Sequence, residues 1–383
     1  MKKIDFVDAD ALQNYLKKKG IPTNESIIDE LTSSFNALLE TRIRQEKNKG
    51  RISKNDSTKE SKPALEALSQ DQLDSLPSWV IQQIDSANVI GSSGQVVQVK
   101  DGRKYHLNNT LNDLSGGEWT YFLNSIISTR FPTSGPESYA HHLRKVHPSP
   151  KPPQLMRQII EFFTKENEIV FDYFMGVGGT LLGASLCNRR AIGIDLSQKY
   201  IDVYKEANAE LQLFEQRTIR ADSTTFLSNP STIIEELNGE KFSLIAIDPP
   251  YGDMMNREKT GETAKRKLDT APTPFTDLAE DLGNLQIEEF YPIFKKSVVD
   301  SLPLLKHKGH VIVFIKDLQP DKSNTNLLHA RVIEDLNSIT GLQYLGTKIW
   351  ADQSVNLYPY GYPYAYVSNQ IHQYIMIFRK MEY

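Results

Sequence analysis

The segment Ser243–Gly252, SLIAIDPPYG, carries residue types that could align an amine for chemistry. An apolar run ends in Asp248, and Pro249, Pro250 and Tyr251 follow it directly. Two consecutive prolines restrict the backbone, which would hold the Asp248 carboxylate and the Pro249 carbonyl in one orientation. These oxygens would accept the two N–H bonds of an exocyclic amine, and the Tyr251 ring offers a face on which a planar base can stack. The pattern favours alignment of an amino nitrogen over hydride transfer.

A glycine-rich turn lies upstream, in the segment Ile169–Thr180, IVFDYFMGVGGT. Glycines let the backbone approach a ligand closely, and the helix that follows offers free N–H groups. Roughly twenty residues later, the expected strand 191–194 ends in Asp195, whose carboxylate is placed to accept hydrogen bonds from ribose hydroxyls. Asp222 follows a third strand and could accept from the amino group of an adenine ring. Together these features predict an adenosine-containing cofactor, and a nicotinamide cofactor is the alternative that the Asp248 segment disfavours.

Three motifs in combination resemble those of the amino-methylating DNA methyltransferases that use S-adenosylmethionine. Asp248–Tyr251 matches the D/N/S-P-P-Y/F/W tetrapeptide of that family, and Phe174-Met-Gly176 matches the start of its F-x-G-x-G loop. The segment His147–Pro153, HPSPKPP, resembles the H-P-x-x-K-P element that lies against the methionine part of the cofactor in the family. The order of these motifs resembles the class in which the cofactor loop precedes the catalytic tetrapeptide. The resemblance covers roughly residues 140–380.

Two positions depart from the family pattern. Asp172-Tyr173-Phe174 stands where the family usually has Asp-Pro-Phe, and the glycine loop, GVGGT, is one residue longer than G-x-G-T. These departures bear on the exact cofactor contacts, while the role of the loop is expected to be kept.

The resemblance implies transfer of a methyl group from S-adenosylmethionine to the N6 amino group of adenine in double-stranded DNA, by base flipping and direct in-line transfer. N4-cytosine DNA methylation and guanine-N2 RNA methylation are the alternatives, and a non-catalytic DNA-binding subunit is disfavoured by the intact tetrapeptide. C5-cytosine methylation needs a cysteine nucleophile, whereas Cys187 is expected to be a small buried helix residue. We expect the catalytic residues to be Asp248, Pro249, Pro250 and Tyr251. We expect the cofactor-binding residues to be His147, Pro148, Ser149, Lys151, Asp172, Tyr173, Phe174, Met175, Gly176, Gly178, Gly179, Thr180, Asp195, Leu196, Ser197, Asp222 and Ser223.

Surfaces for DNA are indicated less directly by the sequence. Residues 252–285 form a long basic-to-acidic insertion after the tetrapeptide, and loops of this length are usually functional or disordered. The candidate phosphate-contacting residues in it are Arg257, Lys259, Lys265, Arg266 and Lys267. The tyrosine-rich segment 357–366 would either line the base pocket or pack under a final hairpin. Residues 141–145 would either touch DNA or form a solvated turn.

From about residue 150, expected strands alternate with expected helices, which is typical of a mostly parallel sheet covered on both faces. The strands are expected at 168–171, 191–194, 218–221, 243–247, 310–315, 343–350 and 371–379. We therefore predict an α/β fold with a Rossmann-like seven-stranded methyltransferase sheet and an antiparallel last strand. The accompanying helices are expected at 153–164, 180–188, 197–213, 231–237, 287–305 and 325–338.

The N-terminal part is expected to be mainly helical. Helices are expected at 9–19, 24–39, 64–86 and 117–129, with a polar linker over 45–62 and a hairpin over 96–106 around Asp101-Gly102. We divide the chain into residues 1–62, a helical region with a flexible linker; 63–135, an accessory region for DNA recognition or dimerisation; and 136–383, the catalytic domain.

The composition is that of an ordinary globular protein. The 383 residues contain 44 Lys and Arg against 48 Asp and Glu, a formal net charge of −4, so the whole chain is not a general polyanion binder. The single cysteine and the absence of a long apolar run or leader-like segment favour a cytoplasmic, nucleoid-associated protein without membrane attachment. The eight histidines show no zinc-binding spacing, so no metal is expected. A homodimer, or a place in a modification or defence complex, is compatible with the sequence.

Overall fold

The structure is a computed structural model that describes Lys17 and residues 61–91, 94–252, 275–317, 327–360 and 362–381. The chain divides into two compact units, one of residues 1–108 with 115–117 and one of residues 109–114 with 118–383. Apart from Lys17, the helices expected at 9–19 and 24–39 lie outside the described residues. So do residues 45–60 of the expected linker.

The described part of the smaller unit is a four-stranded antiparallel sheet with short helices. The strand order is β1-β2-β3-β4, and Val97 of β3 pairs with Tyr105 of β4, as the hairpin prediction requires. The single helix expected over 64–86 is instead broken into short helices, because Ser69 caps one of them through a capping box with Gln72 and Pro77 precedes another. The elements are β1 (Lys62–Pro63), α3 (Ala64–Ala67), α4 (Gln70–Asp74), α5 (Ser78–Ile81), η1 (Ile84–Ser86), β2 (Asn88–Ile90), β3 (Val96–Gln98) and β4 (Lys104–His106).

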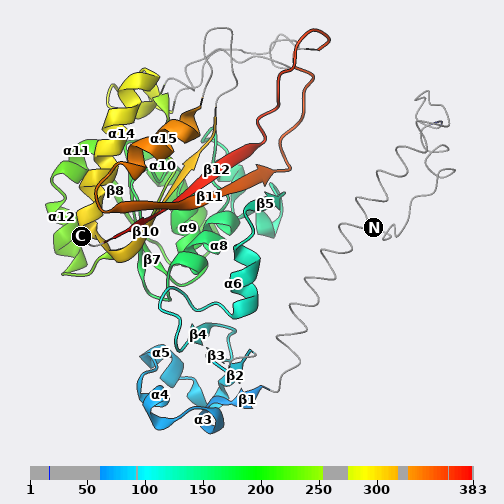
Figure 1. Cartoon of the computed structure of the whole chain (residues 1–383), viewed down its shortest axis with the longest axis vertical. Coiled ribbons are helices and arrows are strands. Elements are labelled where there is room, and N and C mark those ends of the chain that lie inside the picture. Colours follow the sequence, from blue (N-terminus) through cyan, green and yellow to red (C-terminus); the bar gives the residue numbers. More distant parts are fainter. Residues whose placement is uncertain are drawn as a thin grey trace. The chain divides into compact units, whose positions relative to one another are not determined.

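The larger unit is built from alternating strands and helices (Figure 1). Its strands are β5 (Ile126–Thr129), β6 (Ile169–Asp172), β7 (Arg190–Asp195), β8 (Arg217–Arg220), β9 (Phe242–Ile247), β10 (Leu305–Ile315), β11 (Leu342–Asp352) and β12 (His372–Lys380). The remaining helices are α6 (Gly116–Phe122), η2 (Pro136–Ser138), α7 (His141–Arg144), α8 (Pro153–Phe163), α9 (Gly179–Ser185), α10 (Gln198–Glu210), α11 (Ser223–Ser228), α12 (Ser231–Leu237), η4 (Leu282–Asn284), α14 (Ile287–Ser301), η5 (Leu302–Leu304) and α15 (Leu328–Asn337).

Within the described part of the chain, the large sheet has eight strands in the order β5-β11-β12-β10-β9-β6-β7-β8. Strands β10, β9, β6, β7 and β8 are parallel to one another, whereas β12 is antiparallel to both β10 and β11. The predicted Rossmann-like, mostly parallel sheet with an antiparallel last strand is confirmed. Its parallel strands bring the residues that follow β6, β7, β8 and β9 to one edge, which we call the carboxyl edge.

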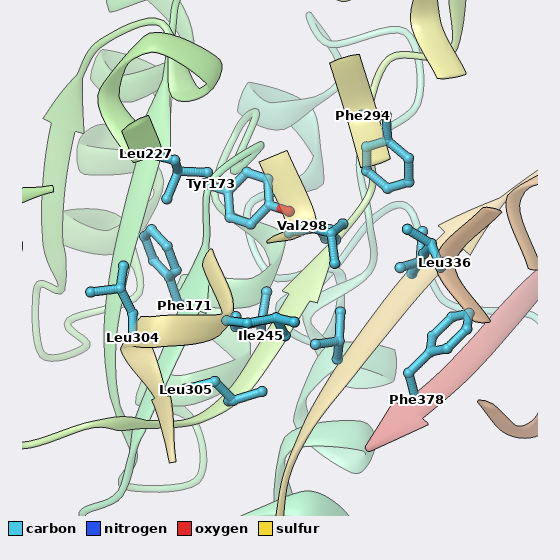
Figure 2. Packing of buried hydrophobic residues seen from close by; sticks show 14 of the residues in the cluster. Phe171, Tyr173, Leu227, Ile245, Phe294, Val298, Leu304, Leu305, Leu336 and Phe378 are labelled. Carbon is cyan, nitrogen blue, oxygen red and sulfur yellow. The ribbon is translucent and has the colours of Figure 1, made fainter. Parts of the chain in front are cut away.

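Two apolar cores sandwich the sheet, because alternate residues of each buried strand point to opposite faces. Leu244 and Ala246 of β9 face α8, α9 and α10, whereas Ile245 and Ile247 face α11, α12, α14 and α15. Figure 2 shows the core that contains Ile245, to which Phe294 and Val298 of α14 contribute. The strand β9 is buried along its whole length, as expected for a strand covered by helices on both faces.

The prediction of seven strands was wrong by one, because residues 117–129 are not a single helix. The helix α6 ends at Phe122, the Asn124 side chain accepts from the Ile126 backbone N–H at 3.1 Å, and β5 follows. The β-branched residues of β5 favour a strand, and β5 pairs in parallel with residues 349–352 of β11. Residues 118–135 thus belong to the larger unit, whereas we had placed them in the accessory region.

Candidate active site

A cavity opens at the carboxyl edge of the sheet, where β6, β7 and β9 end. It brings together the tetrapeptide Asp248–Tyr251 and most of the residues expected to bind the cofactor. The expected residues that line it are His147, Ser149, Lys151, Asp172, Tyr173, Phe174, Met175, Gly176, Gly179, Thr180, Asp195, Leu196, Asp222 and Ser223. The other residues expected to bind cofactor, Pro148, Gly178 and Ser197, are not among the lining residues, although each is a sequence neighbour of one that is.

Asp248 follows the last residue of β9 and makes an ion pair that the sequence did not indicate. The Lys151 ammonium bonds to Oδ2 of Asp248, and the two side chains are only 9% and 22% exposed. Burial raises the pKa of the Asp248 carboxyl, and the Lys151 charge opposes that rise. The ion pair holds the carboxylate at the cavity wall and engages one of its two oxygens.

Tyr251 is nearly buried, at 6% exposure, and lines the cavity beside the two prolines. Its hydroxyl accepts a hydrogen bond from the backbone N–H of Lys316, just after β10, and burial raises its pKa. The chain then turns away at Gly252, which has a φ of +65°. The tyrosine ring is therefore fixed at both ends, by the tetrapeptide and by β10.

The glycine loop between β6 and α9 can be built only from glycine at its tightest point. Gly178 has a φ of +74°, and a Cβ atom there would lie 2.2 Å from the Tyr204 ring. A Cβ atom on Gly179 would lie 2.5 Å from the Lys151 carbonyl oxygen. The loop backbone thus packs against α10 on one side and against the HPSPKPP segment on the other.

Asp172, at the end of β6, ties this loop together. Its carboxylate accepts from the Phe174 backbone N–H at 3.0 Å and from the Thr180 hydroxyl at 2.5 Å. Burial raises the pKa of Asp172 to about 7. We expected Asp172 to contact cofactor directly, but its carboxylate instead joins β6 to the first turn of α9.

Asp195, at the end of β7, reaches back to the same loop. It accepts from the backbone N–H groups of Gly176 and Ser197, each at 2.8 Å, and burial raises its pKa to about 7. Each carboxylate oxygen has one such donor and retains a second lone pair. Asp195 lines the cavity, so it still has acceptor capacity for a hydroxyl of a bound molecule.

Asp222 caps α11, and its acceptor sites are already in use. The backbone N–H groups and the hydroxyls of Thr224 and Thr225 all donate to it, at 2.5–3.3 Å. An amino group can bind here only where one threonine hydroxyl turns away. The neighbouring Ser223 hydroxyl donates to the Tyr173 carbonyl and thereby joins α11 to the end of β6.

His147 covers the glycine loop as a neutral ring. Its Nδ1 accepts from the Ser149 backbone N–H at 3.2 Å, and its ring packs against Tyr200 and Phe275. Burial lowers its pKa to about 4. A Cβ atom on Gly176 would lie 3.2 Å from its Nε2, so the ring and the loop are in close contact.

Arg144 belongs to the segment 141–145, for which we considered a DNA contact or a solvated turn, and it fits neither. It is 2% exposed, and its guanidinium donates to the carbonyls of Tyr139 and Lys151, each at 3.0 Å. Burial lowers its pKa to about 10. Arg144 therefore supports the backbone that carries Lys151, the partner of Asp248.

Several lining residues had no signal in the sequence. Tyr200 of α10 reaches the cavity and donates to the Phe275 carbonyl at 3.0 Å. Asp281 accepts from the Thr276 hydroxyl and the Gly283 backbone N–H, which closes a small turn inside the expected insertion. The lining residues that we did not predict are Pro150, Met156, Val177, Tyr200, Ala246, Ile247, Phe275, Thr276, Glu280, Asp281, Leu282 and Phe314.

Other predicted features lie away from the cavity or beyond what is described. Arg257, Lys259, Lys265, Arg266 and Lys267 lie outside the described residues. Cys187 is buried just after α9, its Sγ donates to the Gly183 carbonyl at 3.1 Å, and burial raises its pKa to about 12. Among the described residues, no three His, Cys, Asp or Glu side chains gather where they could hold a metal ion. Nor is any described helix both long and apolar enough to cross a membrane.

Comparison with known proteins places these features in a family. A family model described as DNA methylase matches residues 14–206, a stretch that includes the HPSPKPP segment and the glycine loop. The tRNA (guanine(10)-N2)-dimethyltransferase of Methanocaldococcus jannaschii is 28% identical over 201 residues, which cover 51% of this chain and 55% of that protein. The probable type III restriction-modification enzyme HindVI Mod subunit of Haemophilus influenzae is 29% identical over 42% of this chain and 20% of its own length.

Shorter and more distant similarities accompany these matches. The type II methyltransferase M.HinfI of Haemophilus influenzae is 38% identical over 69 residues, which are 18% of this chain and 19% of that protein. The solved structure of TrmN from Thermus thermophilus aligns with 60% of this chain and 48% of its own, at 15% identity and a TM-score of 0.37. The chain spans about half the length, or less, of the curated relatives described here. Since the family model covers half of the chain, the protein belongs to the N6/N4 DNA methylase family.

Proposed function

We propose that this protein transfers a methyl group from S-adenosylmethionine to the N6 amino group of adenine in double-stranded DNA. The observation that carries the proposal is one shared cavity, in which Asp248 and Tyr251 lie beside the glycine loop and Asp195. One wall can thus grip an amine while the adjoining wall holds an adenosine-containing methyl donor.

The charges of the cavity fit a cationic methyl donor. Among the described residues that line it, six are acidic, against the single ammonium of Lys151 and the neutral ring of His147. Two of the six, Asp172 and Asp195, have pKa values raised to about 7, so a bound cation would favour their charged forms. The glycine loop also brings backbone to the cavity, because Gly176 and Gly179 line it. S-adenosylmethionine, when bound, supplies an electrophilic methyl group on a positively charged sulfur.

Each wall would hold one part of the donor. We assign the ribose hydroxyls to Asp195, which retains free lone pairs. The adenine amino group is assigned to Asp222, where the hydroxyl of Thr224 or Thr225 must turn away to free an acceptor. The methionine part is assigned to the HPSPKPP segment, where His147 and Lys151 line the cavity beside Gly176.

The tetrapeptide would perform the alignment. The target base must leave the helical stack, at a cost of a few kcal/mol, and would then stack against Tyr251. Lys151 occupies Oδ2 of Asp248, which leaves Oδ1 and the Pro249 carbonyl to accept the two N–H bonds of the amine. Held this way, the nitrogen lone pair would be directed at the methyl group. This alignment would supply much of the reduction in the activation free energy of methyl transfer. The Asp248 carboxylate also offsets the positive charge that develops on the nitrogen.

Methylation of guanine N2 in RNA is the second candidate, because tRNA (guanine(10)-N2)-dimethyltransferases from two archaea are among the similar proteins. An exocyclic guanine amine would meet the same pair of acceptors. The DNA methylase family model and the type II and type III DNA methyltransferase relatives support DNA instead. N4-cytosine offers the same amine chemistry and remains the alternative within DNA.

Radioactive methyl incorporation separates these candidates. The protein is incubated with S-[methyl-³H]adenosylmethionine and either genomic duplex DNA or unmodified tRNA. We expect label in the adenines of the DNA, and none with Asp248→Ala, which keeps cofactor affinity in calorimetry. Label in tRNA guanine alone would replace DNA by RNA as the substrate. An active Asp248→Ala variant would discard the mechanism. The expected cytoplasmic location and membership of a dimer or defence complex stay predictions.

A further inference from the structure

The connection between β11 and β12 carries three tyrosine side chains that are largely exposed to solvent. Tyr362 is 80% exposed, and Tyr364 and Tyr366 are each 94% exposed. Such exposure is unusual for large aromatic residues, which favour burial. For segment 357–366 the sequence left two alternatives, lining the base pocket or packing under the hairpin, and Tyr362, Tyr364 and Tyr366 do neither.

The base of this connection is held in place by hydrogen bonds. The Asp352 backbone N–H donates to the Ile371 carbonyl at 2.9 Å, next to the paired strands. Further out, the Asn369 side chain exchanges two hydrogen bonds with the Tyr358 backbone, each at 2.8 Å. The exposed tyrosines thus follow a part of the connection whose two sides are joined by hydrogen bonds. Figure 1 shows the connection, in orange-red, extending past the ends of β11 and β12.

The connection leaves the sheet at the carboxyl edge. Ile247, which precedes Asp248, pairs with Val313 of the parallel β10, and Val313 pairs with Met376 of the antiparallel β12. Because β12 runs in the opposite direction, its beginning lies at the edge where β9 ends. The tyrosines are therefore carried on the side of the sheet that holds Asp248.

A second cavity links the base of the connection to the candidate active site. Ser354, Val355 and Ile371 line one side of it. The other side is formed by Ser149, Pro150 and Lys151, which also line the first cavity. The surface is thus continuous from the tyrosine-bearing connection to the residue that binds Asp248.

The chemistry of the connection points to bases rather than phosphates. Residues 353–371 contain no Asp, Glu, Lys, Arg or His, so they offer no charge to a phosphate backbone. They offer phenol rings, which stack on any unpaired nucleobase. We propose that Tyr362, Tyr364 and Tyr366 stack on unpaired nucleobases next to the base that enters the cavity. This inference rests on the proposed function in that the substrate is a nucleic acid.

Three matched variants test the proposal. The three tyrosines are changed together to alanine, to leucine, which keeps apolar bulk without a ring, or to phenylalanine, which keeps the ring. Affinity is measured at several salt concentrations for fluorescein-labelled 30-nucleotide single-stranded DNA, the matching duplex, the duplex with a central mismatch, and RNA of the same sequence. Circular dichroism and S-adenosylhomocysteine binding establish that each variant is folded.

We expect the alanine and leucine variants to bind mismatched and single-stranded DNA roughly ten- to hundredfold more weakly than the wild type, and the phenylalanine variant to match it within about threefold. The slope of log Kd against log salt should stay unchanged, because no phosphate contact is removed. Wild-type affinity in the alanine variant, or full rescue by leucine, would overturn the proposal; leucine rescue would show that apolar bulk, and not stacking of an aromatic ring, supports binding.

The same measurements separate this inference from the proposed function. A wild type that binds only RNA contradicts the DNA substrate, while a loss of RNA affinity in the alanine variant still supports base stacking. A wild type that binds neither nucleic acid contradicts both proposals.

Discussion

Lys151 and Asp248 form the contact on which the proposed chemistry depends most. A buried carboxylate costs free energy unless a partner offsets its charge, and Lys151 is that partner. The lysine comes from the HPSPKPP segment, nearly a hundred residues upstream in the sequence, and Arg144 supports its backbone. Lys151 is therefore a positioning residue that keeps Asp248 charged and correctly oriented.

Removing that positive charge should shift the pH dependence of methyl transfer. Transfer needs ionised Asp248, and Lys151 opposes the rise of its pKa through burial. In Lys151→Met the pKa of Asp248 rises further, so the acid limb of the kcat profile moves to higher pH. Lys151→Arg, which keeps the charge, should restore the limb. An unshifted limb in a folded Lys151→Met variant would show that the ion pair does not control Asp248.

Gly178 should be the least replaceable glycine of the loop. Gly178→Ala combines a positive φ with a Cβ atom 2.2 Å from Tyr204, whereas Gly239→Ala meets only the positive φ, with no atom within 4 Å. We expect Gly239→Ala to lower the free energy of unfolding by about 1–2 kcal/mol. Gly178→Ala should cost roughly 1–3 kcal/mol more because of the collision. Urea denaturation measures both, and equal losses would mean that the loop moves freely away from α10.

At the scale of elements, local patterns predict most of the large sheet. Strands β6 to β12 and helices α8, α9, α10, α12, α14 and α15 were expected near their observed places, because each carries its own apolar pattern. The short helix α11 was not expected. Strand β5 was missed because Ile126 and Ile127 continue the helical apolar pattern of α6. Residues 126–129 form a strand because they pair with β11, and that tertiary contact cannot be read from the local sequence.

The same reasoning explains what the sequence could reveal of the site. Asp195 and Asp248 were found because they end apolar strands, and parallel strands bring such ends together. The pairing of Lys151 with Asp248 and the approach of Asp281 depend on how distant segments pack. No local pattern records those contacts.

Lys348 of β11 should make stability depend on alkaline pH. Its ammonium is buried and bonds to the carbonyls of Phe122 and Asn124, which joins α6 to the sheet. Burial lowers its pKa from 10.5 to about 8. Between those values the unfolded chain binds a proton that the folded protein lacks, so this lysine makes stability rise with pH.

Urea denaturation of the wild type and of Lys348→Met between pH 7.5 and 10.5 checks this. The unfolding free energy of the wild type minus that of Lys348→Met should increase as pH rises through that range. A difference that is constant or shrinks would mean that the amine stays charged in its buried position.

At the scale of the whole molecule, the two units have separate apolar cores. The core of the smaller unit contains Ala64, Val80 and Val97, whereas the candidate active site lies wholly in the larger unit. Ligand binding stabilises only the structure that contacts the ligand or folds cooperatively with it.

Hydrogen exchange with and without S-adenosylhomocysteine should show this division. We expect slower exchange at 172–180, 194–201 and 275–283, which line or support the cavity, and unchanged exchange at 62–90 and 95–107. Protection spread equally over both units would mean that they respond as one cooperative body.

The central claim is that this site methylates the N6 amino group of adenine in duplex DNA through Asp248. Single-molecule sequencing of DNA from cells that express the wild type or Asp248→Ala tests it most directly, because the method reads both the modified base and its sequence context. We expect N6-methyladenine at a defined sequence context with the wild type and none with the variant. Unmodified adenines throughout the DNA of cells that contain folded wild-type protein would contradict it.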